Sequence, residues 1–201
     1  MGEVVKLKTD LRVLAAALLL ACTSLMSVGT TPSMAQGIFD GDAFDTTMIR
    51  AIRSGDNDVV EQQLFTDSAN DRSNSGVPAL IVAVESRNIG AVRLLADAGA
   101  HIDNRARRTD RTALTLAAEL GEINIVRELL ERGADVDKTG EGTEVALIKA
   151  ARNGHAEILQ ILVDADAYLD ETDLSGNSAL ELAERNRHRA AAQVLRDAGA
   201  Y

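Results

Sequence analysis

Cysteine and aromatic side chains are scarce in this sequence. It has one cysteine, no tryptophan, two tyrosines and three phenylalanines among 201 residues. The single thiol, Cys22, cannot form a disulfide within the chain, and a mature chain that begins after it has no thiol for catalysis. So few aromatic rings cannot build a surface on which the bases of a nucleic acid stack.

Basic residues are outnumbered as well. Lysine and arginine total 21 against 31 aspartates and glutamates, which gives a net charge of −10. A chain this acidic repels phosphate backbones and anionic membrane surfaces. We therefore expect no nucleic-acid binding and no non-specific adhesion to membranes.

The first 35 residues have the organisation of an export signal. Basic residues precede an apolar stretch at residues 13–21, and small residues lead up to the bond between Ala35 and Gln36. The apolar stretch is shorter than the roughly 18 residues of a membrane span. We predict that residues 1–35 are a signal peptide, that residues 36–43 are a connector, and that the protein is exported to a bacterial periplasm.

A second processing site lies in the same segment. The run Leu19-Leu20-Ala21-Cys22 resembles a bacterial lipoprotein box, in which the cysteine is lipidated after cleavage before it. Lipidation at Cys22 would tether the protein to a membrane, whereas cleavage after Ala35 would leave it free. Cys22 is equally accounted for as one more small apolar residue, and we prefer cleavage after Ala35.

Two dipeptides recur at a fixed interval. Ala-Leu and (Gly/Asp)-Ala each occur four times in phase, with successive separations of 34, 33 and 33 residues. The Ala-Leu pairs begin at residues 79, 113, 146 and 179, and the (Gly/Asp)-Ala pairs at 99, 133, 166 and 199. Similarity at this period indicates an array of stacked repeats, which usually presents a binding surface.

Within one unit the apolar residues have helical spacing. Leu114, Leu116 and Ala117 give one short helix an apolar side, and Ile125, Val126 and Leu129 do the same for the next helix; these positions are read directly from the sequence. Each helix is shorter than the roughly 12–15 residues at which an isolated helix becomes marginally stable. The helices must therefore be stabilised by neighbouring repeats.

The segment Thr112–Ala117 resembles the Thr-Pro-Leu-His-x-Ala signature of ankyrin repeats, with alanine in place of proline and threonine in place of histidine. The resemblance implies an all-α ankyrin-repeat solenoid of about five helix-turn-helix units over residues 44–201, similar to exported bacterial proteins of this family. The expected units are residues 44–72, 73–106, 107–139, 140–172 and 173–201.

Several residues depart from the repeat pattern where a glycine is expected. Gly121 and Gly133 follow the two helices of the third unit, where a left-handed backbone ends a helix. Arg87 and Arg187 replace the first of these glycines in other units, and Asp166 replaces the second. We expect strained or reshaped helix ends at these three positions.

The terminal units have the features of caps. In the last unit Glu184 and Arg196 stand where the third unit has Ala118 and Leu130. Polar residues on an outward face suit a repeat that has no neighbour beyond it.

No catalytic constellation is present in the sequence. His101, His155 and His188 are the only histidines, and they are spaced one per repeat with no cysteine nearby, so we predict no metal site and no cofactor. His155 and His188 occupy equivalent places, where ankyrin repeats often use histidine for structural hydrogen bonds. We predict that the protein is not an enzyme.

The loop between the second and third units carries a cluster of arginines. It contains Arg105, Arg107, Arg108 and Arg111 and is one residue longer than the two loops that follow it. These cations in an acidic protein are candidates for docking a partner that is acidic at the contact. The alternative is a solvated loop whose arginines pair with surface carboxylates.

The resemblance to ankyrin repeats also implies binding positions on the concave face. They fall on Glu119, Leu120, Glu141, Glu144, Arg152, Asn153, Asn177, Arg185 and Asn186. Leu120 is expected to be an exposed apolar residue beside Arg108 and Arg111. We predict a monomeric, non-enzymatic protein-interaction module or scaffold in the bacterial envelope; the alternatives are a lipoprotein scaffold tethered through Cys22 and a secreted effector that acts on a host protein.

Overall fold

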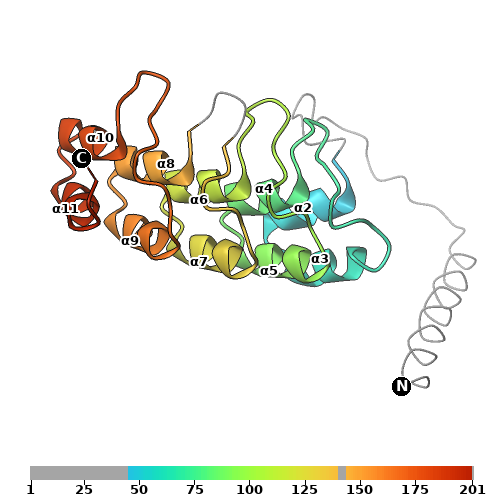
Figure 1. The fold of residues 1–201 in the computed structure, drawn as a ribbon. Helices are drawn as coiled ribbons and strands as arrows, with labels where there is room; N and C mark the ends of the chain where they lie inside the picture. Colours follow the sequence, from blue (N-terminus) through green and yellow to red (C-terminus); the bar gives the residue numbers. More distant parts are fainter. Residues whose placement is uncertain (1–44, 140–143, 201) are drawn as a thin grey trace, which may run out of the picture. The chain divides into compact units, whose positions relative to one another are not determined.

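The computed structural model describes residues 45–139 and 144–200, all within the second of two compact units, Phe39–Tyr201. The described residues contain ten α-helices and no β-strand, arranged as five helix pairs (Figure 1). The first helices of the pairs are α2 (Thr47–Ser54), α4 (Ala79–Glu85), α6 (Ala113–Leu120), α8 (Ala146–Asn153) and α10 (Ala179–Arg185). The second helices are α3 (Asn57–Gln63), α5 (Ile89–Asp97), α7 (Ile123–Glu131), α9 (Ala156–Asp164) and α11 (Arg189–Asp197).

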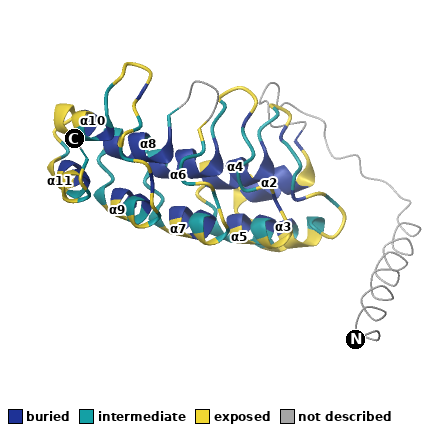
Figure 2. Cartoon of the chain, in the orientation of Figure 1, coloured by how far each residue is buried: buried dark blue, intermediate teal, exposed yellow. Residues whose placement is uncertain are grey.

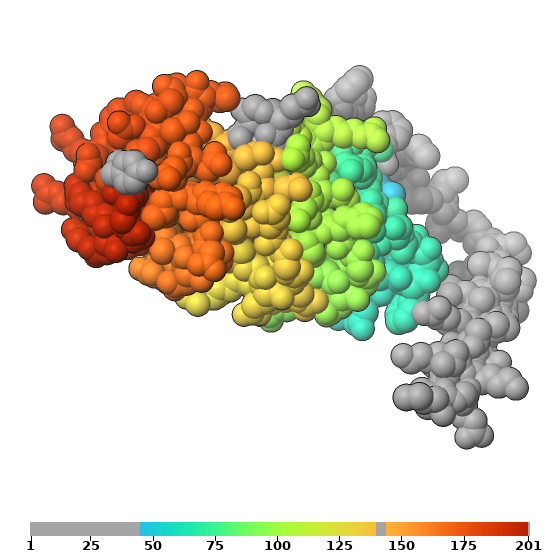
Figure 3. Space-filling view, viewed as in Figure 1, coloured from blue at the N-terminus to red at the C-terminus, as the bar shows by residue number. Residues whose placement is uncertain are grey.

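Each helix pair packs against the pairs next to it. The first helices contact one another in chain order from α2 to α10, and the second helices contact one another from α3 to α11. The pairs therefore form two layers of helices, joined by loops that rise from one side of the array (Figure 1). In the space-filling view the repeats follow one another as adjoining bands of colour (Figure 3). The all-α solenoid of five stacked helix-turn-helix units expected from the sequence is confirmed.

Side chains at the helix starts satisfy backbone groups that have no partner inside the helix. The hydroxyl of Thr112 accepts a bond from the Thr115 amide at 3.1 Å, and the Thr115 hydroxyl accepts one from the Thr112 amide at 3.0 Å. Ser178 and Glu181 form the same reciprocal arrangement at the start of α10. These boxes fix where α6 and α10 begin.

The helix ends have the left-handed backbone that the sequence predicts. Gly121 has φ 79°, and Arg87 and Arg187 have φ of 53° and 61° at the equivalent positions; Asp166, at the position of Gly133 (φ 82°), has φ 61°. Asp110, with φ 51°, adopts the same region without having been expected to. Asp110 stands at the repeat position of Gly76 and Gly176, which both have φ of 80°, so the turn has the same backbone in these three units.

The core is aliphatic and lies between the two helix layers and between successive repeats (Figure 2). Alanines at equivalent places, among them Ala83, Ala117 and Ala150, are fully buried and allow close approach of neighbouring first helices. The two aromatic residues among those described, Phe65 and Tyr168, are exposed. Packing therefore relies on leucine, isoleucine, valine and alanine, which the low aromatic content of the sequence indicates.

The last helix pair has the polar outer residues expected of a cap. Glu184 and Arg196 are both exposed and form an ion pair of 2.5 Å between α10 and α11. Among the described residues, no helix is both long enough and apolar enough to cross a membrane.

Candidate functional site

We call residues 105–111, between α5 and α6, the arginine loop. Its four arginines have two kinds of surroundings. Arg105 is half-buried with its guanidinium 3.8 Å from Asp110, and Arg111 forms an ion pair of 3.1 Å with Glu119 of α6. Arg107 and Arg108 are exposed, and neither forms an ion pair with any residue that the structure describes. Half of the cluster is thus held within the protein, and half faces solvent.

In-chain hydrogen bonds fix the shape of this loop. The amide of Asp110 donates to the carbonyl of Ala106 at 2.7 Å, and the amide of Ala106 donates to the carbonyl of Arg111 at 3.0 Å. Arg72, from the preceding loop, donates to the carbonyls of Arg105 and Gly76 at 3.2 and 2.8 Å. The backbone that carries Arg107 and Arg108 is therefore tied to two successive repeats.

A column of polar pairs runs along the junction between the loops and the first helices. In each pair, one residue lies two positions before the first residue of a first helix. Its partner lies eight positions further along the chain, near the end of that helix. We call this set the junction column: Asp45–Arg53, Arg111–Glu119, Glu144–Arg152 and Asn177–Arg185. The pairs recur because the repeat returns both positions to the same place in every unit.

The junction column is most extensively bonded around Arg152. Its guanidinium binds Glu144 through both terminal nitrogens and lies 3.2 Å from Asp173 in the next loop. Lys149 reaches Glu144 at 3.2 Å and Glu119 at 3.8 Å, so the network extends from the third unit to the fifth. The hydrogen bond from Arg152 to Glu144, followed by the charges of Glu144 and Asp173, raises the pKa of this guanidinium.

The side chain of Asp173 holds the loop before α10 in place. The pKa of its carboxyl is lowered, chiefly by the backbone N–H of Asn177 and also by the Asn177 side chain, the Ser175 amide and the charge of Arg152. Both Ser175 and Asn177 donate their amides to Oδ1 of Asp173, at 2.8 and 2.9 Å. The carboxylate therefore organises the loop tip at Leu174 and fastens it to α8.

One unit lacks its pair in the junction column. Glu85 occupies the later position in the second unit, but the residue eight positions earlier is Val77. Burial raises the pKa of Glu85, while the neighbouring charges of Arg53 and Arg111 act in the opposite direction. Glu85 is exposed in the structure, so the penalty on its charge is small, and no side chain bonds it directly among the described residues.

Two predicted binding positions instead link successive repeats. Asn153 donates to the carbonyl of Glu119 at 3.3 Å, and Asn186 donates to the carbonyl of Arg152 at 2.9 Å. Nε2 of His155 lies 3.2 Å from that same Glu119 carbonyl, and the equivalent histidine of the next unit repeats this contact. These side chains satisfy the open carbonyls at the ends of α6 and α8, which is the structural role expected of the histidines.

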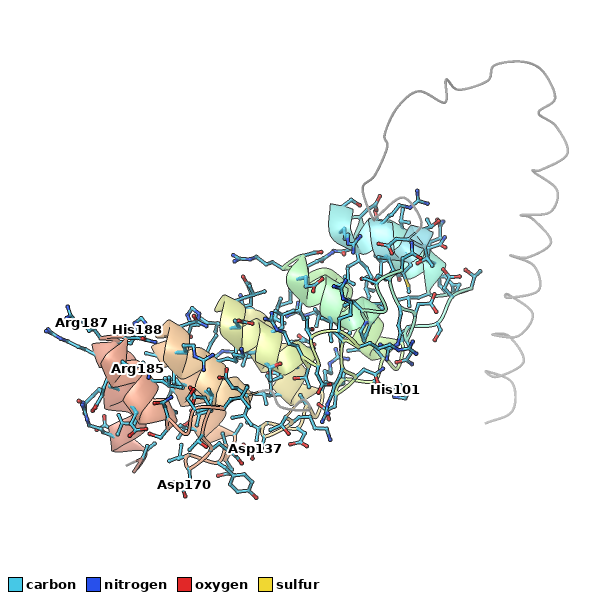
Figure 4. All side chains as sticks on the ribbon, turned by 90° about the horizontal axis from the view of Figure 1, so that it is seen from above. His101, Asp137, Asp170, Arg185, Arg187 and His188 are labelled. Atoms are coloured by element: carbon cyan, nitrogen blue, oxygen red, sulfur yellow. The ribbon has the colours of Figure 1, made fainter. Side chains whose placement is uncertain are left out.

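The closing turns after the second helices are joined by a further series of bonds. The amide of His101 donates to Asn70 at 2.8 Å, and the amide of Tyr168 donates to Asp137 at 3.0 Å. His101, Asp137 and Asp170 follow one edge of the array (Figure 4). Tyr168, held by this bond at its amide, has two thirds of its surface exposed (66%).

The expectation of an exposed Leu120 is wrong. Leu120 is the last residue of α6 and is partly buried, since its side chain packs against the core. The exposed apolar residues are Leu174 at a loop tip (83% exposed), Tyr168, and Phe65 after α3. The sequence signal that could have indicated Leu174 is a leucine flanked by Asp173 and Ser175 in a turn, where a polar residue is the norm.

Three sequence predictions lie outside the described residues. They are the signal peptide and connector at residues 1–43, lipidation at Cys22, and a binding role for Glu141. Within residues 45–139 and 144–200, no three histidine, cysteine, aspartate or glutamate side chains are grouped so as to hold a metal ion.

Comparison with known families bears on the whole array. Residues 48–140 match the family model "Ankyrin repeats (3 copies)", and residues 129–183 match "Ankyrin repeats (many copies)". None of the curated sequences compared matches the chain. Together the two matches span more than half of the sequence, and ankyrin repeats are generally protein–protein interaction modules without enzymatic activity. The chain is therefore an ankyrin-repeat protein.

Proposed function

We propose that this ankyrin-repeat protein is a non-enzymatic module that binds a partner protein through its turn loops and the adjoining ends of its first helices. The observation that carries the proposal is a set of loop tips that in-chain hydrogen bonds hold in place while Arg107, Arg108 and Leu174 remain exposed. Side chains held in this way lose less conformational entropy on binding than side chains of a loop that orders on contact.

The exposed side chains define the chemistry of the partner. Arg107 and Arg108 offer guanidinium groups, which bind carboxylates through paired hydrogen bonds. Tyr168 and Leu174 offer apolar surface on the last loop, and arginine and tyrosine are enriched among residues that contribute most to binding. The contact surface of the partner is therefore acidic opposite the third unit and apolar opposite the fifth.

Most charged residues of the junction column pair with one another, so they hold the loops in position and do not offer charge to a partner. Arg111, Glu119, Glu144 and Arg152 are neutralised by one another within the protein. Their pairing leaves these four residues with little attraction for an external ion, whereas Arg185 bonds only the neutral side chain of Asn177. This separates the predicted binding residues into exposed contacts at the loop tips and paired residues that keep the loops in position.

Affinity purification from the source cell's envelope, with identification of the co-eluting protein, supplies the partner for a direct test. We expect Arg107→Glu/Arg108→Glu to reduce capture of that partner by at least about tenfold, since each lost charge-assisted bond contributes about 1.5 kcal/mol or more. Helix content and melting temperature should stay unchanged because both side chains are exposed.

Two variants separate binding from general charge and from folding. Arg127→Glu reverses an exposed charge on α7, away from the loops, and should leave capture unchanged. Arg111→Glu would place a carboxylate beside Glu119 and lower stability, so it serves as the folding-defective comparison. Unchanged capture by Arg107→Glu/Arg108→Glu would disprove the proposed binding loop.

We further propose that the protein is exported and acts in the periplasm. The support is the basic, apolar and small-residue order of residues 1–35. Mass spectrometry of the mature protein should find an N-terminus at Gln36. A lipidated N-terminus at Cys22 would instead make the protein a tethered scaffold, and recovery from the medium or a host fraction would favour a secreted effector.

A further inference from the structure

The outer side of the last helix pair contains a shallow hollow of about 720 Å³. We call the surface around it the terminal face; the residues that define it are Ala183, Glu184, Arg187, Arg189, Ala192 and Arg196. The two alanines are buried, and the four charged side chains are exposed. Arg187 lies beside Arg185 and His188 at the connection between α10 and α11 (Figure 4).

In the inner repeats, the equivalent surface is covered by the next unit. Gly121 and Gly154 correspond to Arg187, and the rings of His155 and His188 from the following units lie against these two glycines. A β-carbon on either glycine would come within 2.7 Å of a ring atom. At the fifth unit no further repeat follows among the described residues, so the hollow is the place that such a ring and its helix would otherwise fill.

Two positions of the terminal face that are apolar in the fourth unit are arginines in the fifth. This is more positive charge than a cap requires. Ala156 and Val163 of the fourth unit correspond to Arg189 and Arg196 of the fifth. Any polar side chain would end the stack, and in a chain of net charge −10 a carboxylate would serve. Residues 183–197 nevertheless contain four arginines against two carboxylates, which gives this end the opposite sign to the whole chain.

The arginines of the terminal face differ in whether they form an ion pair. Arg196 is paired with Glu184 at 2.5 Å. Arg187 and Arg189 form no ion pair with any residue of the described part of the chain. Two guanidinium groups without an ion-pair partner among the described residues thus line the hollow.

We propose that the terminal face is a second binding surface, separate from the turn loops, which takes a carboxylate-rich segment of a protein. The side-chain carboxylates of such a segment would bind Arg187 and Arg189 in paired hydrogen bonds. The charge complementarity that supports this occupant is local, since the remainder of the chain repels an acidic segment.

A local fluorescent reporter tests the proposal without knowledge of the natural partner. Gln193→Cys, in a chain that also carries Cys22→Ser, places a single label at the rim of the hollow. A glutamate-rich peptide should change the fluorescence of this label with saturation, and the affinity should fall with added salt. Arg187→Asn/Arg189→Gln should weaken binding by about tenfold, because two charge-assisted contacts are lost; asparagine tolerates the positive φ at position 187.

The control variant removes two positive charges from the arginine loop and leaves the terminal face unchanged. Arg107→Gln/Arg108→Gln changes the net charge equally and should leave the response at position 193 intact, although it weakens binding at the loops. Equal weakening by both double variants would show attraction to charge alone and overturn the proposal. A response to anionic lipid vesicles but not to the peptide, or a response of the protein alone that rises with its own concentration, would overturn it in favour of a lipid or a second copy.

Discussion

Arg152 binds Glu144, eight residues before it, through both terminal nitrogens of its guanidinium, with Nη1 2.6 Å from Oε2. The Glu144 side chain is only 10% exposed. The pair therefore joins the loop before α8 to the end of that helix in surroundings that are largely shielded from water. Since the same guanidinium also contacts Asp173 at 3.2 Å, it links the fourth repeat to the fifth.

Replacing Arg152 should test how much this link stabilises the array. Arg152→Ala leaves the shielded Glu144 carboxylate without its strongest partner, so we expect the free energy of unfolding to fall by about 2 kcal/mol. Urea unfolding followed by circular dichroism measures the change. Arg127→Ala removes an ion pair with Glu157 in which both side chains are more than half exposed, and it should cost under about 0.5 kcal/mol. Equal losses in the two variants would contradict the role given to Arg152.

Acid should weaken the last loop through Asp173. The pKa of Asp173 in the folded protein is lowered from 3.8, so the folded state favours the charged carboxylate more than the unfolded state does. Its stabilisation is present above pH 3.8 and is lost as the pH falls through the lower, folded-state pKa. Asp173→Asn should therefore melt below the unmodified protein at pH 7, and the gap in melting temperature should close at strongly acidic pH. A gap that is constant with pH would show that the charge of Asp173 has no part.

Glu85 should have the opposite dependence on pH. Its pKa is raised from 4.5, chiefly by burial, so the charged carboxylate is less favourable in the folded state than in the unfolded state. The resulting penalty is absent below pH 4.5 and develops as the pH rises through the higher, folded-state pKa. Glu85→Gln should therefore raise the melting temperature at pH 7 and have no such effect near pH 3. A lower melting temperature at pH 7 would indicate that Arg53 and Arg111 stabilise the Glu85 charge more than burial opposes it.

The sequence predicts the fold from its period alone. Repeated Ala-Leu and (Gly/Asp)-Ala pairs place the helix starts and the closing turns, and a 33-residue repeat requires equivalent residues to have equivalent surroundings. For the same reason the left-handed backbone at Arg87 and Arg187 follows from the glycines that they replace. The positions of helix starts and turns are set within each unit, although the helices themselves are stabilised by packing against neighbouring repeats.

The candidate site was predicted less well because it depends on which side chains meet across the loops. Arg111 and Glu119 are both binding candidates by position, yet they neutralise each other, and no period in the sequence states that pairing. The sequence predicts an exposed Leu120, but its side chain packs against the core, a contact that the repeat period does not specify. Arg107 and Arg108 remain candidates because neither is near enough to a described carboxylate to form an ion pair.

Contact between repeats should make two similar glycines respond differently to substitution. Gly133 and Gly154 both have positive φ, 82° and 78°, so alanine at either position costs about 1 kcal/mol of backbone strain. A β-carbon at Gly133 has no atom within 4 Å, whereas one at Gly154 would lie 2.5 Å from the ring of His188. The ring must move, and Nε2 of His188 would lose its 3.1 Å contact with the Arg152 carbonyl. We therefore expect Gly154→Ala to lower the free energy of unfolding by about 1–3 kcal/mol more than Gly133→Ala, measured by urea unfolding. Combining Gly154→Ala with His188→Ala should remove most of the excess, since the ring is then absent; an excess that persists in the double variant would assign the loss to the backbone and not to packing between the fourth and fifth repeats.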